Sequence, residues 1–448
     1  MRDLTEGSIN RHLVAMAAPI AAGMIFQTMY FLVDLYFVGR LGGAAIAGVG
    51  SAGNLAFLVM ALTQVLGVGT VALIAQAVGR KDQARANLVF NQASILAMAS
   101  LLACLILGFL FAGHFAGALG SNQATREAGA TYLRWYLPGL ALQFALVAMA
   151  SALRGTGIVK PAMTAQMLTV VINVILAPVL IGGWGTGHPL GVAGAGLASS
   201  IAIAVGVLLM WVYFLRLEHY VGFDRSNWKP RLDVWRQILA IGLPAGGEFA
   251  IMFVIFSFIY FVIRPFGASA QAGFGVGTRV MQAIFLPAMA VAFAVAPIVG
   301  QNFGAGKSAR VRQTFRSAAL ISVVLMLIVM AVCLGRPALL IGAFISEPEA
   351  IRVGSGYLRF VSWNCVSSGF VFVCSGVLQG LGNTWPALWS SASRLVTFMT
   401  PVWWLTTRPN FSITEIWMVS VASVTLQALL SGTLALRQMR LRLAPPGN

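Results

Sequence analysis

Charged residues are scarce in this chain of 448 residues: Asp, Glu, Lys and Arg make up 9% of the sequence, whereas hydrophobic residues make up 59%. A typical globular domain carries about 25% charged residues. So few charges cannot cover the surface of a folded domain in water. The composition therefore excludes a soluble protein and predicts an integral membrane protein.

Histidine and cysteine are also rare, with four residues of each type. The cysteines lie inside apolar segments without the spacing of metal ligands, and the histidines lie near the ends of these segments or between them. Motifs of the DDxxD, GxSxG, HExxH and Walker types are absent from the sequence. We therefore expect no cofactor, no metal site and no enzymatic activity.

Long apolar runs are abundant instead. Each run is long enough to cross a bilayer as a helix of about 20 residues, and the first run is too long for the core of a signal peptide. The expected spans of the first half are residues 13–38, 46–76, 91–117, 131–152, 161–183 and 190–215. Those of the second half are residues 236–262, 271–300, 315–343, 355–378, 386–407 and 413–436. The sequence thus predicts an all-α integral membrane protein with twelve transmembrane helices.

The two halves repeat each other at a constant offset of 225 residues, as Pro19 and Pro244 or Tyr132 and Tyr357 show. Independent loops would not share their lengths by chance, so the chain contains an internal duplication. Because each copy has an even number of spans, the repeat is parallel, with a pseudo-two-fold axis along the membrane normal. We expect two six-helix lobes at residues 1–218 and 236–448, joined by a cytoplasmic linker at 219–235.

Basic residues predict the orientation of the protein in the membrane. They cluster in alternate connections, in the central linker and at the C-terminus, for example at Lys81, Lys160, Lys229, Lys307 and Arg440. The positive-inside rule therefore places both termini of this multi-pass protein in the cytoplasm. We expect the protein to lie in a bacterial-type cytoplasmic (inner) membrane. The net charge of +17 fits this rule and attraction to anionic lipids. We expect contacts with membrane lipid and no binding of nucleic acid.

Two acidic residues lie well inside apolar spans, where a charge is costly and by default functional. Asp34 lies in the first span and shares a helical face with Tyr30 and Gln27, and Glu248 lies in the seventh span. A proline precedes each acid in its span and allows the helix to bend. At the equivalent position of the other copy, one acid is replaced by isoleucine and the other by glycine. Neither acid therefore belongs to a shared packing scaffold.

A purely structural role stays open for both acids. Arg279 or Arg394 could neutralise Glu248, and Arg40 at the end of the first span could reach Asp34. In the functional interpretation, each acid binds a transported ion or compound instead.

Other polar and apolar residues inside the spans give weaker signals. Asn173 and Ser199 could complete an ion or proton site, or could bond neighbouring helices to each other. Methionines and phenylalanines such as Met252 and Phe253 would suit either an adaptable cavity or a lipid-facing surface.

Several segments resemble those of the multidrug and toxic compound extrusion (MATE) exporters. The resemblance rests on Asp34 with the FVGRLG segment at 37–42, the GQNFGAG segment at 300–306, the Leu-Pro pair four residues before Glu248, and the duplicated turns at 154–157 and 379–382. It covers nearly the whole chain. It implies two six-helix lobes around a central cleft, in a secondary active antiporter that expels cationic or amphipathic organic compounds by alternating access in exchange for H⁺ or Na⁺.

The resemblance also implies roles for single residues: Asp34 couples transport to an ion, and Glu248 handles the substrate or a cation. Where some relatives place a second acid in the fifth span, this chain has Ala177, which favours the proton over sodium. We expect a coupling site of Asp34, Tyr30, Asn173, Ser199 and Gln27. We expect a substrate site of Glu248, Arg279, Gln282, Asn364, Met252 and Phe253.

A flippase for lipid-linked oligosaccharides or other lipids is the alternative function. It would need a strongly cationic cavity for pyrophosphate, and Arg279 and Arg394 are the only obvious central bases. The expected partners are therefore a small-molecule organic cation and H⁺ or Na⁺, and we expect the monomer to be functional.

Overall fold

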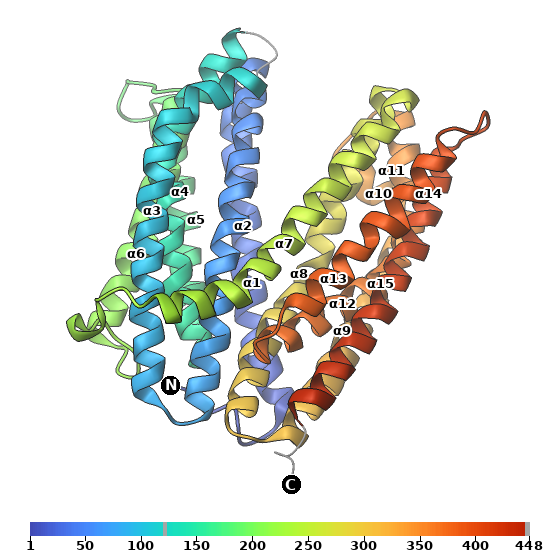
Figure 1. The fold of residues 1–448 in the computed structure, drawn as a ribbon. Coiled ribbons are helices and arrows are strands. Elements are labelled where there is room, and N and C mark those ends of the chain that lie inside the picture. The colour runs from blue at the N-terminus through green and yellow to red at the C-terminus, as the bar shows by residue number, and fades with distance from the viewer. Residues whose placement is uncertain (120–122, 444–448) are drawn as a thin grey trace. The chain divides into compact units, whose positions relative to one another are not determined.

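The computed structural model describes residues 1–119 and 123–443, and every regular element in these ranges is a helix (Figure 1). The helices of the first half are α1 (Ile9–Gly39), α2 (Gly43–Gly79), α3 (Gln83–Leu119), α4 (Gln123–Gly155), α5 (Lys160–Gly182) and α6 (Val192–Arg216). The helices that follow are η1 (Arg225–Asn227), α7 (Leu232–Ile263), η2 (Arg264–Phe266), α8 (Ala268–Gly304), α9 (Ser308–Gly335), α10 (Pro337–Gly342), α11 (Pro348–Val361), α12 (Asn364–Gly380), α13 (Trp385–Arg394), the π-helix η3 (Leu395–Met399), α14 (Thr400–Leu405) and α15 (Ile413–Arg442).

These helices account for the twelve predicted spans. In the described ranges, ten uninterrupted helices are long and apolar enough to cross a membrane. An eleventh span is the pair α11 and α12, which is bent by 56° at the break between its two helices. The segment α13–η3–α14 corresponds to the predicted span 386–407, and a π-helical turn interrupts its α-helix. The predicted span 315–343 also ends earlier than expected, because Pro337 starts the separate helix α10.

Contacts divide the chain into two compact units. Unit 1 consists of Met1–Asp3 and Ala22–Gly242, and unit 2 consists of Leu4–Ala21 and the residues from Leu243 onward. The division cuts α1 and α7, so each of these helices starts in one unit and ends in the other, and a proline lies within a few residues of each cut. The lobe boundaries predicted from the repeat stay a prediction, because contacts measure which residues pack together and not which were duplicated.

The same pairs of helices pack in both units. In unit 1, α4 packs against α2, α3 and α6, and in unit 2 the equivalent helix α12 packs against α8, α9 and α15. A glycine lies at an equivalent close contact in each unit: a Cβ at Gly155 would lie 3.2 Å from the carbonyl oxygen of Val71, and one at Gly380 would lie 2.5 Å from that of Ala296. Small residues at these positions let the helix backbones approach each other, which explains why the glycine occurs in both copies.

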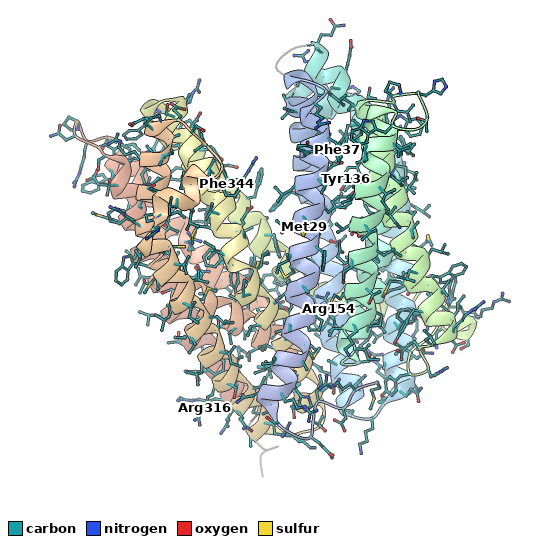
Figure 2. All side chains as sticks on the ribbon, turned by 180° about the vertical axis from the view of Figure 1, so that it is seen from behind. Met29, Phe37, Tyr136, Arg154, Arg316 and Phe344 are labelled. Atoms are coloured by element: carbon teal, nitrogen blue, oxygen red, sulfur yellow. The ribbon has the colours of Figure 1, made fainter. Side chains whose placement is uncertain are left out.

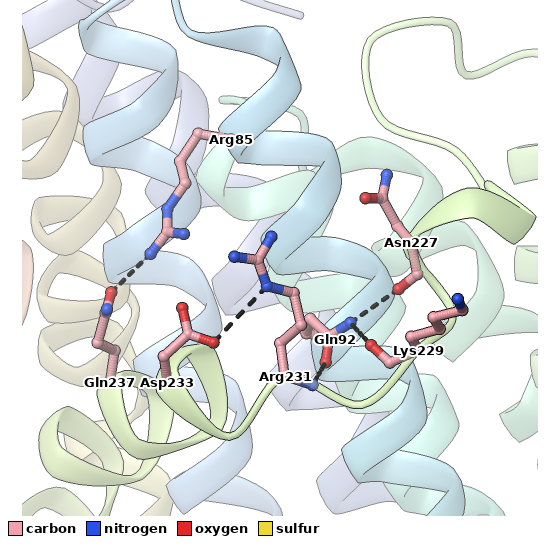
Figure 3. Close-up of polar contacts among 7 residues, drawn as sticks. All are labelled: Arg85, Gln92, Asn227, Lys229, Arg231, Asp233 and Gln237. Carbon is pink, nitrogen blue, oxygen red and sulfur yellow. Dashed lines mark hydrogen bonds and ion pairs between the residues drawn. The ribbon is translucent and has the colours of Figure 1, made fainter.

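The linker after α6 is held against α3 in unit 1. Gln92 is fully buried and donates from Nε2 to the carbonyl oxygens of Asn227 (2.7 Å) and Lys229 (2.8 Å), while its Oε1 accepts from the backbone N–H of Arg231 (2.8 Å) (Figure 3). Arg85 donates to Oε1 of Gln237 at the start of α7 (2.6 Å) (Figure 3). The linker is therefore held in place by hydrogen bonds to α3, and these contacts fix where α7 begins.

The N-terminal segment is held in a similar way in unit 2. The backbone N–H of Leu4 donates to Oε1 of Gln301 (2.9 Å), and Asn302 donates to the carbonyl oxygen of Leu4 (3.1 Å). Lys307 donates to the carbonyl oxygen of Thr5 (3.0 Å). These contacts anchor the chain just before α1 and give the GQNFGAG segment, seen first as a sequence signature, a structural role.

Candidate functional site

Asp34 is a buried acid in the second half of α1, inside unit 1. Its side chain is 6% exposed, and Oδ2 accepts a hydrogen bond of 3.2 Å from the hydroxyl of Tyr132 on α4. Oδ1 is buried and has no hydrogen-bond partner among the described residues. Arg40 bonds to the hydroxyl of Tyr36 (2.6 Å) rather than to Asp34. The carboxyl group thus has a neutral donor on one oxygen, and the other oxygen has no partner among the described residues.

Three of the predicted neighbours of Asp34 lie together in unit 1. Asn173 on α5 and Ser199 on α6 are fully buried, and the amide of Asn173 donates to Oγ of Ser199 (3.4 Å). The hydroxyl of Tyr30 lies beside both of them, one helical turn before Asp34. The ring of Tyr30 packs against Val170 on α5 and holds this part of α1 in place. The structure therefore brings Tyr30, Asn173 and Ser199 together beside the turn of α1 that precedes Asp34.

Gln27 is exposed and does not join this group. Two tyrosines that the sequence analysis did not select lie there instead. Tyr132 bonds to Asp34, and the ring of Tyr136 lies 5.1 Å from that of Tyr132 and close to the carboxyl group. In Figure 2, Tyr136 lies between the levels of Met29 and Phe37 along α1. The recurrence of Tyr132 as Tyr357 in the repeat was the signal that could have identified the first tyrosine.

Glu248 is a partly buried acid on α7, inside unit 2. The hydroxyl of Ser375 on α12 donates to its Oε1 (3.1 Å), and Ser391 on α13 is a second hydroxyl partner. Behind these serines, Gln379 donates to Ser375 and Gln427 on α15 donates to Ser391, each over 3.3 Å. The acid therefore lies in a network of neutral groups from three helices.

The predicted basic partners do not contact Glu248. Glu248 bonds instead to neutral hydroxyl groups, whereas other acids do pair with arginines, for example Asp233 with Arg231 and Glu349 with Arg352. Arg279 and Gln282 are exposed on α8, and Asn364 on α12 donates to Ser420 (3.3 Å) instead. Met252 is partly buried and Phe253 is 47% exposed. Of the predicted substrate residues, Glu248 is the one that the structure places in a polar network.

The two acids can perform the same kind of chemistry. Both are ionisable groups inside apolar helices, and both are surrounded by hydroxyl and amide groups rather than by cations. Such a carboxyl group is costly to keep charged without a counter-ion. Each acid can therefore take up a proton or an organic cation and release it when its surroundings change.

Comparison with known proteins is consistent with this geometry. The MatE family model matches residues 19–179 and 244–405. The probable multidrug resistance protein YpnP of Bacillus subtilis (strain 168) is 29% identical over 392 residues, which cover 85% of this chain and 84% of that protein. The multidrug export protein MepA of Staphylococcus haemolyticus (strain JCSC1435) is 26% identical over 384 residues, covering 84% and 83% of the two chains.

The fold is also similar to solved structures. A crystal structure of MATE in the straight conformation has a TM-score of 0.91 and 23% identity, with 98% of each chain covered. An outward-facing multidrug resistance MATE family transporter of the MOP superfamily has a TM-score of 0.87 and 23% identity, with 99% of this chain and 98% of that chain covered. The twelve-helix fold predicted from the sequence is therefore confirmed.

Proposed function

The chain belongs to the MatE family of multidrug efflux transporters, and we propose that it exports cationic or amphipathic organic compounds in exchange for protons. The observation that carries this proposal is Asp34. It is a buried acid that accepts from a neutral donor and has no cationic partner among the described residues. Such a group is a carrier for one positive charge.

The surroundings of Asp34 favour a proton over a sodium ion. A hard cation needs several oxygen ligands that turn their lone pairs toward it. Here Tyr132 turns a donor toward the acid, and Ala177, which is fully buried on α5, supplies no second carboxylate. A proton needs only the one carboxylate and a polar neighbour. Asp34 is therefore proposed as the proton carrier, with Tyr30, Asn173 and Ser199 as its supporting groups.

Glu248 is proposed as the acid that binds the exported cation. Its serine partners are neutral, so an organic cation would find an uncompensated carboxylate in unit 2. Protonation and cation binding stabilise different conformations of the protein, and this difference is sufficient for exchange by alternating access.

The test uses purified protein in liposomes that contain a fluorescent organic cation, with either a pH gradient or a sodium gradient imposed. We expect the pH gradient to drive transport. Asp34→Asn should abolish this gradient-driven transport and leave the protein folded and able to bind the dye, because asparagine keeps the shape of the side chain and loses the titration. Transport driven by sodium at fixed pH, with no response to a pH gradient, would refute proton coupling.

The orientation in the membrane is part of the same proposal. We place both termini and the 219–235 linker in the cytoplasm of a bacterial-type cell, because the basic residues cluster in these segments. Single cysteines at Arg225 and at Trp184, in connections on opposite sides, test this assignment with a membrane-impermeant thiol reagent in intact cells. Labelling at position 225 from outside would reverse the orientation.

A further inference from the structure

The side chain of Ser200 on α6 enters the backbone hydrogen bonds of α4, inside unit 1. Its hydroxyl accepts from the backbone N–H of Gly139 (3.1 Å) and donates to the carbonyl oxygen of Trp135 (2.6 Å). This donor and this acceptor are four residues apart, so in an uninterrupted α-helix they would bond to each other. The hydroxyl of Ser200 therefore bridges one turn of α4 from a neighbouring helix.

The turn that Ser200 bridges is also the turn that Pro138 weakens. Proline has no N–H to donate to the carbonyl oxygen of Arg134, and its ring crowds that carbonyl. Helices bend at prolines and where a side chain enters the backbone ladder, and both occur in this turn. The hydroxyl of Ser200 satisfies two backbone groups here, so it determines the direction of α4 before Pro138.

The second copy of the repeat shows the same position without such a bridge. Trp363 lies 225 residues after Pro138, at the break between α11 and α12, where the helix bends by 56°. The equivalent of Ser200 is Thr425, whose hydroxyl donates to a carbonyl oxygen one turn earlier in its own helix α15 (2.9 Å). In unit 1 the helix contains a proline and still continues as one element. A hydroxyl from the neighbouring helix thus bridges the unbroken copy, and its counterpart in the broken copy bonds elsewhere.

The part of α4 before this bridge holds the partner of Asp34. Tyr132 lies six residues before Pro138 and donates to Oδ2 of Asp34 over 3.2 Å. That distance already exceeds the usual O–H···O range of about 2.5–3.0 Å, so a small change in the direction of α4 would break the contact. A Cβ at Gly196 on α6 would lie 2.7 Å from the carbonyl oxygen of Tyr132. Helix α6 therefore supports the backbone of α4 at Tyr132 and again at the bridge.

The serine next to Ser200 has a different role. Oγ of Ser199 accepts from the amide of Asn173 on α5 (3.4 Å), within the proposed coupling group. Successive residues of an α-helix are about 100° apart around its axis, so Ser200 faces α4 instead. Ser200 thus acts on the site through the backbone of α4.

We propose that Ser200 is a positioning residue for proton coupling at Asp34. By bridging one turn of α4, it holds the helix in the direction in which Tyr132 reaches the carboxyl group. The inference rests on the proposed function, since it assigns Ser200 a part in the proton exchange at Asp34. Ser200→Ala should therefore act like Tyr132→Phe, although it leaves the tyrosine hydroxyl in the protein.

Infrared spectroscopy of the purified protein tests the contact without any transport. In acid-titrated protein, the carboxyl band of Asp34 is the band that Asp34→Asn lacks. A carboxyl C=O group that loses its hydrogen-bond donor absorbs at a higher wavenumber. Ser200→Ala should therefore shift this band upward, to its position in Tyr132→Phe.

Two further variants complete the infrared test. Ser200→Cys has a weaker donor and acceptor in the same place, so it should give an intermediate band, and it serves as the test if the alanine variant does not fold. Ser94→Ala is the matched control, because the hydroxyl of Ser94 bonds to the carbonyl oxygen of Phe90 in its own helix α3 (2.9 Å). Its band should stay at the wild-type position.

Efflux of ethidium, a permanent organic cation, from liposomes under a pH gradient tests the consequence for coupling. We expect Ser200→Ala to lower the initial rate by about tenfold, as the loss of the Tyr132 bond would. Binding of ethidium, measured by fluorescence polarisation, should change less than twofold. The double variant with Tyr132→Phe should be no slower than Tyr132→Phe alone, because both changes remove the same contact. Independent effects would instead multiply to about a hundredfold.

The outcomes separate this inference from the proposed function. If Ser200→Ala keeps the wild-type band, the positioning role is refuted whatever its rate of efflux, and export stands as long as the wild type follows the pH gradient. A hundredfold loss in the double variant also refutes the role, since Ser200 would then act apart from Tyr132. If the band shifts as expected but the wild type moves ethidium under no gradient, Ser200 positions Tyr132 and the export function fails.

Discussion

The hydroxyl of Tyr132 on α4 donates a hydrogen bond of 3.2 Å to Oδ2 of Asp34 on α1. This contact joins the second half of α1 to the helix at the centre of unit 1, which packs against α2, α3 and α6. The bond engages one carboxylate oxygen, and Oδ1 has no hydrogen-bond partner among the described residues. Tyr132 therefore fixes the direction in which Asp34 presents its free oxygen, and a change at either residue should alter coupling.

Tyr132→Phe tests this relationship most directly. The phenylalanine ring fills the same space, so the fold should persist, but the carboxyl group loses its hydrogen-bond donor. A hydrogen bond to a charged group contributes about 1.5–3 kcal/mol, so we expect gradient-driven efflux to fall by about tenfold or more. Tyr136→Phe is the matched control, because Tyr136 lies beside Asp34 without a hydrogen bond to it in the described structure, and its efflux should change less than twofold. Equal losses in the two variants would show that the hydroxyl of Tyr132 has no special role.

Glu248→Gln should separate substrates by their charge. Glutamine can still bond to Ser375 and Ser391 but provides no counter-charge, so binding of a permanent organic cation should weaken by about tenfold or more. A neutral compound of similar shape should be affected little. Glu415→Gln is the matched control. It makes the same change at the capping box that begins α15, where glutamine can also act as the capping residue, so binding should not change. Unchanged transport of cations by the Glu248 variant would assign this acid a structural role.

The sequence allowed the helical spans and part of the site to be predicted, for reasons that are local. A carboxylate in an apolar run is visible in one segment, and Tyr30 follows from the helical period because it lies one turn before Asp34. Tyr132 lies 98 residues from Asp34, and which face of α4 meets α1 depends on packing that no single segment encodes. Gln27 has the right period, but the structure leaves its side chain exposed, so it does not join the buried group.

The second half shows the same limit. The composition of residues 386–407 predicts one straight span, and the π-turn after Arg394 is a feature of the folded backbone that hydropathy does not report. Arg394 and Arg279 are equivalent as charges in a sequence, yet the structure buries Nε of the first and exposes the second. Burial and partners, rather than residue type, distinguish the two arginines.

Asp224 in the linker should have a carboxyl pKa below its ordinary value of 3.8. The hydroxyl and the backbone N–H of Ser226 donate to Oδ1 over 2.8 and 2.9 Å, and both bonds stabilise the charged form and lower the pKa. The carboxylate therefore adds to stability above the unfolded pKa, and this contribution is lost as the pH falls through the lowered folded pKa. Ser226→Ala should raise the pKa toward 3.8, as measured by NMR titration of the carboxyl carbon. A titration that is the same in the variant would assign the shift to the backbone N–H of Ser226 and the side-chain amide of Asn227 instead.

Gly242 should be essential for the packing of α7 against α2 in unit 1. A Cβ atom at this position would overlap the carbonyl group of Val65, and a Cβ at Gly69 on α2 would overlap that of Ile238 on α7. Both obstacles are backbone atoms, which cannot rotate away as a side chain can.

Gly242→Ala therefore forces the two helices apart, at a cost of about 1–3 kcal/mol. We expect the midpoint of thermal unfolding in detergent to fall by about 1–3 °C. Gly23→Ala is the matched control on α1, where a Cβ would meet no atom within 4 Å, and alanine favours the helix there. A Gly242→Ala protein as stable as wild type would mean that α7 and α2 can separate without loss, and that the close contact between them does not determine where α7 enters unit 1.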